Sequence, residues 1–188
     1  MVNEFKQDNK DWEGGDSTNF YTYLLLDPKV INEIPYWNDN TTSHNNKWNT
    51  FVRSIFYVGK GQGSRPYDHL QEAKDLLKTY DEVRKTNKKM GKKIQRIWQI
   101  WSEGSGVMIF KAFESIKSVE ACTREAVIIE TLGKQCLCNE KNGTNYGKKV
   151  PELNKYEKSR FGKYLLLQAM RKFLNKYEEI QVFPRHLQ

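Results

Sequence analysis

Residues 56–70 read Phe-Tyr-Val-Gly-Lys-Gly-Gln-Gly-Ser-Arg-Pro-Tyr-Asp-His-Leu, and this stretch decides the fold. Its first residues continue a run of β-forming side chains, so we expect a strand from Phe51 to Gly59. The glycines of the following segment permit backbone angles that other residues avoid, and they predict a sharp turn. Ser64 and Pro66 suit the start of a helix. The apolar residues that follow recur at helical spacing: Leu70, Ala73, Leu77 and Tyr80.

One further strand is predicted before this unit and another after it. Residues Phe20–Leu26 are rich in β-formers and stop at Asp27-Pro28, since proline and its predecessor disfavour a continuing element. Val107–Phe113 resembles a third strand. The polar stretch between Ile34 and Asn49 favours turns, and we interpret it as an extended hairpin loop.

Helical spacing returns in three later segments. Ile97, Ile100 and Trp101 suggest a helix that ends at Gly104, and Val119–Leu132 predicts another that ends at Gly133. The tail from Glu152 to Ile180 interleaves charged and apolar residues helically and is expected to pack on the body. We therefore predict a polar amino-terminal leader (residues 1–19), one domain (20–150) and a helical extension (151–188).

Composition narrows the class of protein. A chain of 188 residues is in the range of one domain, and its formal charge of +8 with a pI near 9.3 favours an acidic polymer as partner.

The odd cysteine count, with no secretory h-region, argues against a disulfide framework, and Cys136-Leu-Cys138 without a matching histidine pair argues against zinc. No apolar run approaches the roughly 20 residues of a membrane span. We expect an intracellular protein, nuclear in a eukaryote and otherwise cytoplasmic, with no small-molecule cofactor.

Glu125 is the first residue that indicates chemistry. On a helical wheel it lies in the middle of an apolar stripe, whereas Glu130 falls on the outer face. Burying an unpaired carboxylate costs several kcal/mol, so a metal ion, a cation or a hydrogen-bond network is expected opposite Glu125. The pattern alone also fits a structural ion pair with Arg124 or Arg65.

Arg65 and His69 form a second pair of interest. Their spacing of four residues places both on one side of the predicted helix near its amino end, where phosphate is attracted. Such a pair alone is more often a solvated face than a site.

The order and spacing of these residues resemble the GIY-YIG nuclease signature. The resemblance runs through Tyr21-Thr22-Tyr23, Tyr57-Val58-Gly59, Arg65, His69 and Glu125. It is closest in residues 23–28 and 56–70, which look like the branch that contains the animal ankyrin-repeat and LEM-domain nucleases, enzymes of branched or bridging DNA. Residues 119–126 and Leu137-Cys138-Asn139 are similar to that branch's third helix and the asparagine beyond it. Departures are the Tyr-Thr-Tyr motif, the long hairpin loop and the lack of ankyrin repeats and a LEM module.

The resemblance implies an α+β fold, a small three-stranded antiparallel sheet flanked by helices, with the carboxy-terminal helical extension added. It implies a phosphodiester hydrolase that cuts DNA to 5′-phosphate and 3′-hydroxyl ends, on branched or otherwise structured DNA in repair. The site residues implied are Tyr23, Tyr57, Arg65, His69, Glu125 and Asn139.

The implied roles follow the chemistry of each side chain. Glu125 would bind one Mg²⁺ or Mn²⁺, and Arg65 would pair with the phosphate. Tyr23, Tyr57 or His69 could act as the base, because free tyrosine titrates near 10 and histidine near 6.5. Asn142 and Asn145 could take the place of Asn139. As an alternative, the two tyrosines could be ordinary packing residues of strands.

Basic residues between the second and third strands would contact phosphates of the substrate, although such runs are usually solvated faces. The residues expected to bind nucleic acid are Lys60, Arg84, Lys85, Lys88, Lys89, Lys92 and Lys93, and Arg96 ends the run. Three tryptophans near polar loops could stack on exposed bases, although a tryptophan is more often a packing residue: Trp12, Trp37 and Trp48. Two rival functions stay open: a non-catalytic nucleic-acid-binding module on the same scaffold, and a nuclease acting on RNA or on a restriction-type target.

Overall fold

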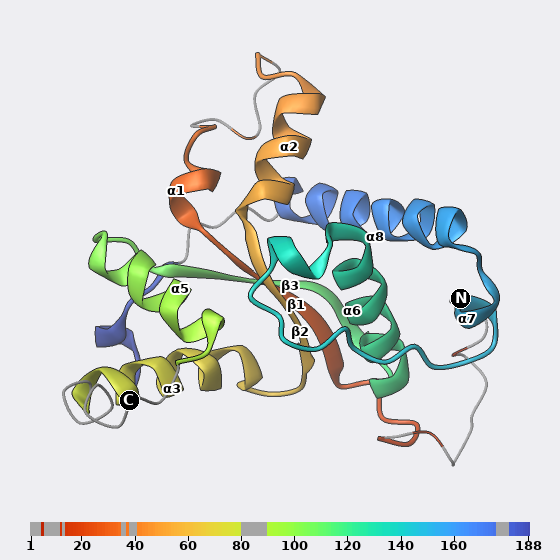
Figure 1. Cartoon of the computed structure of the whole chain (residues 1–188), viewed down its shortest axis with the longest axis horizontal. Helices are drawn as coiled ribbons and strands as arrows, with labels where there is room; N and C mark the ends of the chain where they lie inside the picture. The colour runs from red at the N-terminus through yellow and green to blue at the C-terminus, as the bar shows by residue number, and fades with distance from the viewer. Residues whose placement is uncertain are drawn as a thin grey trace.

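The structure, a computed structural model, describes residues 5, 12, 14–34, 37, 41–79, 90–175 and 181–188. One antiparallel sheet crosses the middle of the molecule, with helices on both of its faces (Figure 1). Its strands are β1 (Phe20–Leu26), β2 (Ile55–Gly61), β3 (Val107–Ile116) and β4 (Gln181–Val182), in the spatial order β2-β1-β3-β4. The α+β class predicted from the sequence is confirmed.

The helices occupy the intervals between the strands. They are α1 (Pro28–Ile31), α2 (His44–Ser54), α3 (Arg65–Lys78), α5 (Lys92–Ser102), α6 (Ser118–Leu132), α7 (Lys149–Glu152) and α8 (Lys155–Asn175), with two short 3-10 turns, η1 (Lys134–Cys136) and η2 (Pro184–His186). Within the described ranges, no helix is both long enough and apolar enough to cross a membrane.

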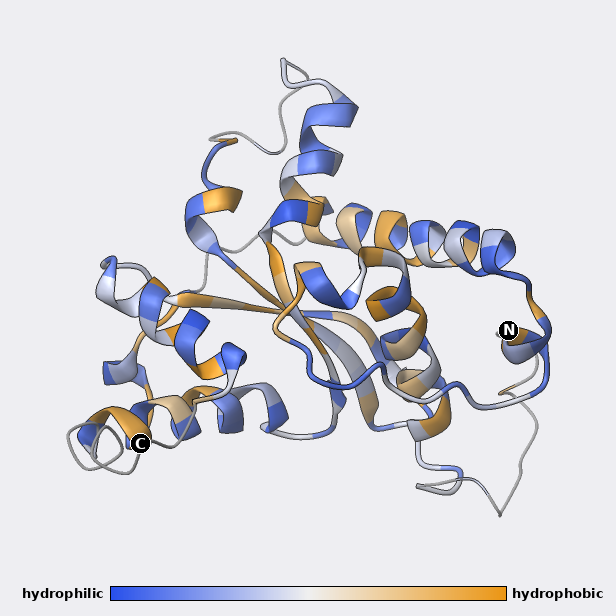
Figure 2. Cartoon of the chain, viewed as in Figure 1, coloured by the Kyte–Doolittle hydropathy of each residue, from blue (hydrophilic) through white to orange (hydrophobic). Residues whose placement is uncertain are grey.

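Both faces of the sheet are covered, which explains why every residue of β1 from Tyr21 to Leu26 is buried. Leu24 and Leu26 face a core shared with α2, α6 and α8. Tyr23 and Leu25 face a second core formed with α3 and α5. Apolar residues accordingly gather along the strands, and the polar faces of the long helices are turned outward (Figure 2). The alternation places every second residue of β1 on the side of α3, and Tyr23 is among them.

The predicted extended loop between Ile34 and Asn49 is wrong in its second half. His44–Ser54 forms α2, with the Ser43 hydroxyl accepting a hydrogen bond from the Asn46 N–H at 3.3 Å. The predicted strand from Phe51 consequently begins later, at Ile55. Phe51 is fully buried against Phe110 and Phe173, and this tertiary contact outweighs its β propensity.

The sheet also has a fourth strand that the three-stranded prediction lacked. β4 pairs with the start of β3, where Val107 lies opposite Val182 and Met108 opposite Gln181. The strand is two residues long and its partner is distant in the sequence, so no local pattern indicates it. The predicted helical tail is present as α8, while the end of that prediction, residues 176–180, lies outside the described residues, as does Tyr80.

The carboxy-terminal helix packs closely on α6. Leu165, Leu166, Met170 and Phe173 of α8 belong to the larger core. The helices approach so closely at Gly162 that a Cβ atom there would lie 1.7 Å from the Thr131 hydroxyl oxygen.

Replacing Gly162 with alanine tests this contact. Helix propensity alone would make alanine more stable by about 1 kcal/mol, whereas the clash with Thr131 predicts a loss of about 1–3 kcal/mol. Urea unfolding of the two proteins measures the difference. A more stable Gly162→Ala variant would contradict the close approach of α8 to α6.

Candidate active site

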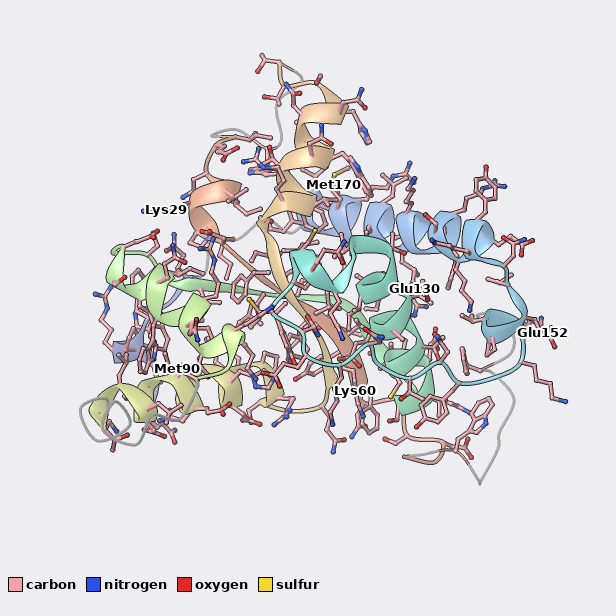
Figure 3. All side chains as sticks on the ribbon, viewed as in Figure 1. Lys29, Lys60, Met90, Glu130, Glu152 and Met170 are labelled. Atoms are coloured by element: carbon pink, nitrogen blue, oxygen red, sulfur yellow. The ribbon has the colours of Figure 1, made fainter. Side chains whose placement is uncertain are left out.

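Five of the predicted site residues line one hollow of about 490 Å³. They come from four elements: Tyr23 from β1, Tyr57 from β2, Arg65 and His69 from α3, and Glu125 from α6. Lys60 lines the same hollow. Figure 3 labels it below the crossing strands, near the end of β2 where the chain continues toward α3. Residues up to about a hundred positions apart in the chain therefore meet at one place.

The two aromatic hydroxyls and the histidine form a compact group. The ring centres of Tyr23 and Tyr57 are 6.2 Å apart, and that of His69 lies 5.3 Å from Tyr57 and 6.3 Å from Tyr23. Burial is the largest cause that raises the pKa of both tyrosines above 10, and it acts together with their negative neighbours. Arg65 lowers the pKa of each hydroxyl, but less than burial raises it. Both hydroxyls therefore stay protonated in the protein as it stands.

Two glycines of β2 make room for this group. A Cβ atom at Gly59 would lie 2.4 Å from the Tyr23 hydroxyl oxygen, because Gly59 is the residue opposite Tyr23 in the β1–β2 pair. At Gly61 it would lie 2.6 Å from the Arg65 Cβ and Cγ atoms. Positive backbone angles, the reason predicted for the three glycines of this segment, occur among them only at Gly63, with a φ of 58°. Gly59 and Gly61 are required by close approach of site side chains, a signal that spacing alone does not carry.

Glu125 is a largely buried carboxylate beside these residues. Burial raises its pKa from 4.5 to about 7, and the Lys60 ammonium and backbone N–H offset only part of that rise. The predicted ion pair of Glu125 with Arg124 or Arg65 is not what the structure has. Arg124 pairs with Glu120 at 2.6 Å, and Arg65 lies 3.6 Å from Asp68. The Lys60 groups thus offset only part of the free-energy cost of keeping the Glu125 carboxylate out of water.

The surroundings of Glu125 fit a divalent metal ion that takes few ligands from the protein. Its oxygens are of the type that Mg²⁺ and Mn²⁺ prefer, and Mg²⁺ usually keeps several waters and binds through one or two carboxylates and substrate phosphates. Among the described residues, no group of three His, Cys, Asp or Glu side chains gathers to form a closed site. Glu125 would therefore be the protein's own ligand, with water and substrate oxygens completing the shell.

His69 is tied to Lys93 of α5. The Lys93 Nζ atom lies 2.7 Å from the His69 Nδ1 atom. An ammonium group has no lone pair, so Nδ1 must accept this bond and the ring proton is left on Nε2. Burial, with Lys93 and then Arg65 adding to it, lowers the pKa of His69 from 6.5 to about 4. A neutral histidine with its Nδ1 occupied is a hydrogen-bond donor at the site, which argues against it as the base.

Asn139 does not line the hollow of the other five residues. Its amide oxygen accepts from the Val58 N–H at 3.0 Å, and its amide nitrogen donates to the Val58 carbonyl at 2.7 Å. Beside it the Cys138 N–H donates to the Phe56 carbonyl at 2.7 Å. Residues 138–139 thus cover the outer edge of β2 and fix the strand that carries Tyr57. Asn142 is exposed, and the buried Asn145 Oδ1 atom has no hydrogen-bond partner among the described residues.

The basic run is only partly within the described residues. Arg84, Lys85, Lys88 and Lys89 lie outside them. Lys92 is exposed on α5, Lys93 is turned toward His69, and Arg96 pairs with Asp27 at 2.5 Å. Of these three, Lys92 has the exposure that a phosphate contact needs. Trp37 is buried, with its indole N–H donating to the Ile31 carbonyl, so packing rather than base stacking explains it.

The close approach of Tyr23 and Gly59 gives a double-variant test. Gly59→Ala should destabilise the protein by about 1–3 kcal/mol, because the Tyr23 ring must move. In a Tyr23→Leu background the same change should cost less than about 1 kcal/mol, since the obstructing atoms are gone. Denaturant unfolding of the four proteins measures the coupling. Additive costs would show that Tyr23 does not occupy the space over Gly59.

The buried carboxylate predicts a pH-dependent stability. With its pKa at about 7 in the folded protein and 4.5 when exposed, Glu125 lowers stability progressively as pH rises from 4.5 to 7. Glu125→Gln, in EDTA, should therefore gain about 1–3 kcal/mol on wild type between pH 4.5 and pH 8. Glu130→Gln, on the exposed face of α6, is the matched control and should gain nothing. Equal pH profiles for all three proteins would show that Glu125 is not desolvated.

Comparison with known proteins identifies the family of the chain. The family described as LEM-3-like GIY-YIG domain matches residues 20–188, a range that includes α8 and β4 as well as the site. No solved structure matches the chain significantly.

Curated relatives cover most of the chain. The human ankyrin repeat and LEM domain-containing protein 1 is 37% identical over 190 residues, covering 100% of this chain and 30% of the relative. The mouse protein of that name is 36% identical, covering 95% of this chain and 32% of its own length. The homologue from Caenorhabditis elegans is 32% identical, with 81% and 20% covered. The chain thus spans about a third or less of these relatives. It belongs to the LEM-3-like group of the GIY-YIG family and is a GIY-YIG endonuclease domain.

Proposed function

We propose that this domain is a metal-dependent DNA endonuclease that hydrolyses phosphodiester bonds to 5′-phosphate and 3′-hydroxyl ends. One observation carries the proposal: Tyr23, Tyr57, Arg65, His69 and Glu125 meet around one hollow, where the largely buried carboxylate of Glu125 has the Lys60 ammonium and backbone N–H beside it. A domain that only bound nucleic acid would gain nothing from a carboxylate kept out of water at this position.

Glu125 is the residue that would hold the metal ion, Mg²⁺ or Mn²⁺. When bound, the ion supplies a Lewis acid beside the scissile phosphate and stabilises charge on the departing oxygen. Because its pKa is about 7, the carboxylate holds a proton in slightly acidic solution and must lose it before it can bind a cation.

The remaining residues bind the phosphate, orient the attacking water and donate hydrogen bonds. Arg65 has a planar fork that suits two phosphate oxygens, and its charge persists at any working pH. The hydroxyls of Tyr23 and Tyr57, which stay protonated, orient the attacking water rather than deprotonate it. His69 donates from Nε2 while Lys93 holds its Nδ1 atom. The proton of the water then passes to solvent or to a phosphate oxygen.

Branched or otherwise structured DNA in repair is the substrate that we propose, following the family resemblance. The net charge of +8 and the exposed Lys92 support a polyanionic partner. In a eukaryotic cell this substrate would place the activity in the nucleus.

Cleavage assays test the proposal directly. Supercoiled plasmid and synthetic branched DNA should be cut with Mg²⁺ or Mn²⁺ and left intact in EDTA. Glu125→Gln and Arg65→Ala should each lower the rate by about 10²–10⁴, and Arg65→Lys should recover little because an ammonium group cannot pair with two oxygens. Tyr57→Phe should lose about 10²-fold while its melting temperature stays within a few degrees of wild type.

Glu130→Gln is the matched control for Glu125→Gln, since it removes a carboxylate from the exposed face of the same helix. Cutting that survives Glu125→Gln would refute the metal site proposed here. Binding without cutting under any metal would favour the binding module, and preferential cutting of RNA would change the substrate.

A further inference from the structure

A second and larger hollow lies on the other side of Tyr57 and Glu125. Its volume is about 650 Å³, within the range of about 300–1,000 Å³ that is usual for ligand pockets. Tyr57 and Glu125 line both hollows, so they form the boundary between them. The nuclease function uses the first hollow and leaves the second without a role.

The walls of the second hollow suit a flat apolar body. Leu76 of α3, Ile94 of α5 and Cys138 provide apolar surface, and Met90, labelled in Figure 3 beside α3 and α5, closes one side. The Tyr57 ring, half-buried and shared with the first hollow, offers a face for stacking. Base-to-aromatic stacking is worth about 1–3 kcal/mol for each base.

The charged groups of this hollow argue against a phosphate as occupant. Three carboxyl groups, from Glu72, Glu125 and Glu140, line it together with two ammonium groups, from Lys93 and Lys141. One of the two ammonium groups, that of Lys93, already donates to His69 and lies 3.8 Å from Glu72. Carboxylates accept and ammonium groups donate hydrogen bonds, so a neutral ring whose edge carries both donors and acceptors fits the lining. A nucleobase has these properties.

The position of the second hollow indicates which part of the substrate would supply such a ring. A strand whose phosphate bound beside Arg65 and Glu125 in the first hollow would bring its neighbouring nucleotide toward Tyr57, which lines both hollows. We propose that the second hollow takes an unstacked base adjacent to the scissile phosphate. The inference rests on the proposed nuclease function and adds a substrate feature to it. Extracting a base costs a few kcal/mol, and least where the base is unpaired, so strands with an unpaired base beside the cut are preferred.

Filling the hollow tests the proposal. Leu76→Trp places a large ring in it, and Leu77→Trp makes the same change one position along α3, where the side chain is 40% exposed. Leu76→Trp should slow cleavage about tenfold or more relative to Leu77→Trp on DNA with a base beside the cut. On DNA with an abasic position there, the two variants should differ by less than about twofold. Met90→Trp, which fills the hollow from the segment that precedes α5, is a second variant should Leu76→Trp fail to fold.

A binding measurement separates this proposal from the nuclease function. DNA carrying 2-aminopurine at each position flanking the mapped cut, bound in EDTA, should change its fluorescence intensity with wild type and Leu77→Trp, because the base moves from the DNA stack into the hollow, but not with Leu76→Trp. Cleavage by wild type with unchanged fluorescence, and equal rates for the two variants, would overturn the base pocket and leave the nuclease function standing. This fluorescence change without cleavage under any metal would support the pocket and refute the nuclease. Absence of DNA binding would overturn both.

Discussion

The Tyr23 ring lies over Gly59 of the neighbouring strand, closer than any side chain on that residue would permit. This close approach lets β1 and β2 pair while a large aromatic side chain occupies the space between the sheet and α3. Gly61 plays the same part for the stem of Arg65 at the end of β2. The arrangement of the site depends on glycine at these two positions. The absence of a Cβ atom leaves room for the Tyr23 ring at Gly59 and for the Arg65 side chain at Gly61.

Around this framework the protein keeps its ionisable groups in unusual states. Burial holds the tyrosine hydroxyls protonated and His69 neutral, and it favours the protonated form of Glu125 as far as about pH 7. Arg65 therefore stands as a persistent positive charge facing groups that are neutral or easily neutralised. A divalent ion with a bound phosphate would change this balance, since it would stabilise the ionised form of Glu125. In the proposed function, the free-energy cost of keeping that carboxylate desolvated would be offset when cation and substrate bind.

Positioning contacts lie one layer behind the site. Asn139 imitates a peptide group and pairs with both polar atoms of the Val58 backbone, which steadies the edge strand next to Tyr57. Lys93 selects the tautomer of His69. Neither contact needs to touch the substrate, yet each determines how a side chain that lines the site is presented.

The sequence by itself determined β1, the strand–glycine–helix unit, helix α6 and its buried Glu125, because each depends on local periodicity and on turn chemistry. It also identified the five residues that line the hollow, through the order and spacing of a family signature. Tertiary structure alone decided that Phe51 is helical, that residues 181–182 add a strand, that Asn139 binds backbone and that Lys93 turns inward. These features depend on partners that are distant in the chain. Local propensities differ by about 1 kcal/mol or less, so the burial of one aromatic ring or the pairing of one edge strand outweighs them.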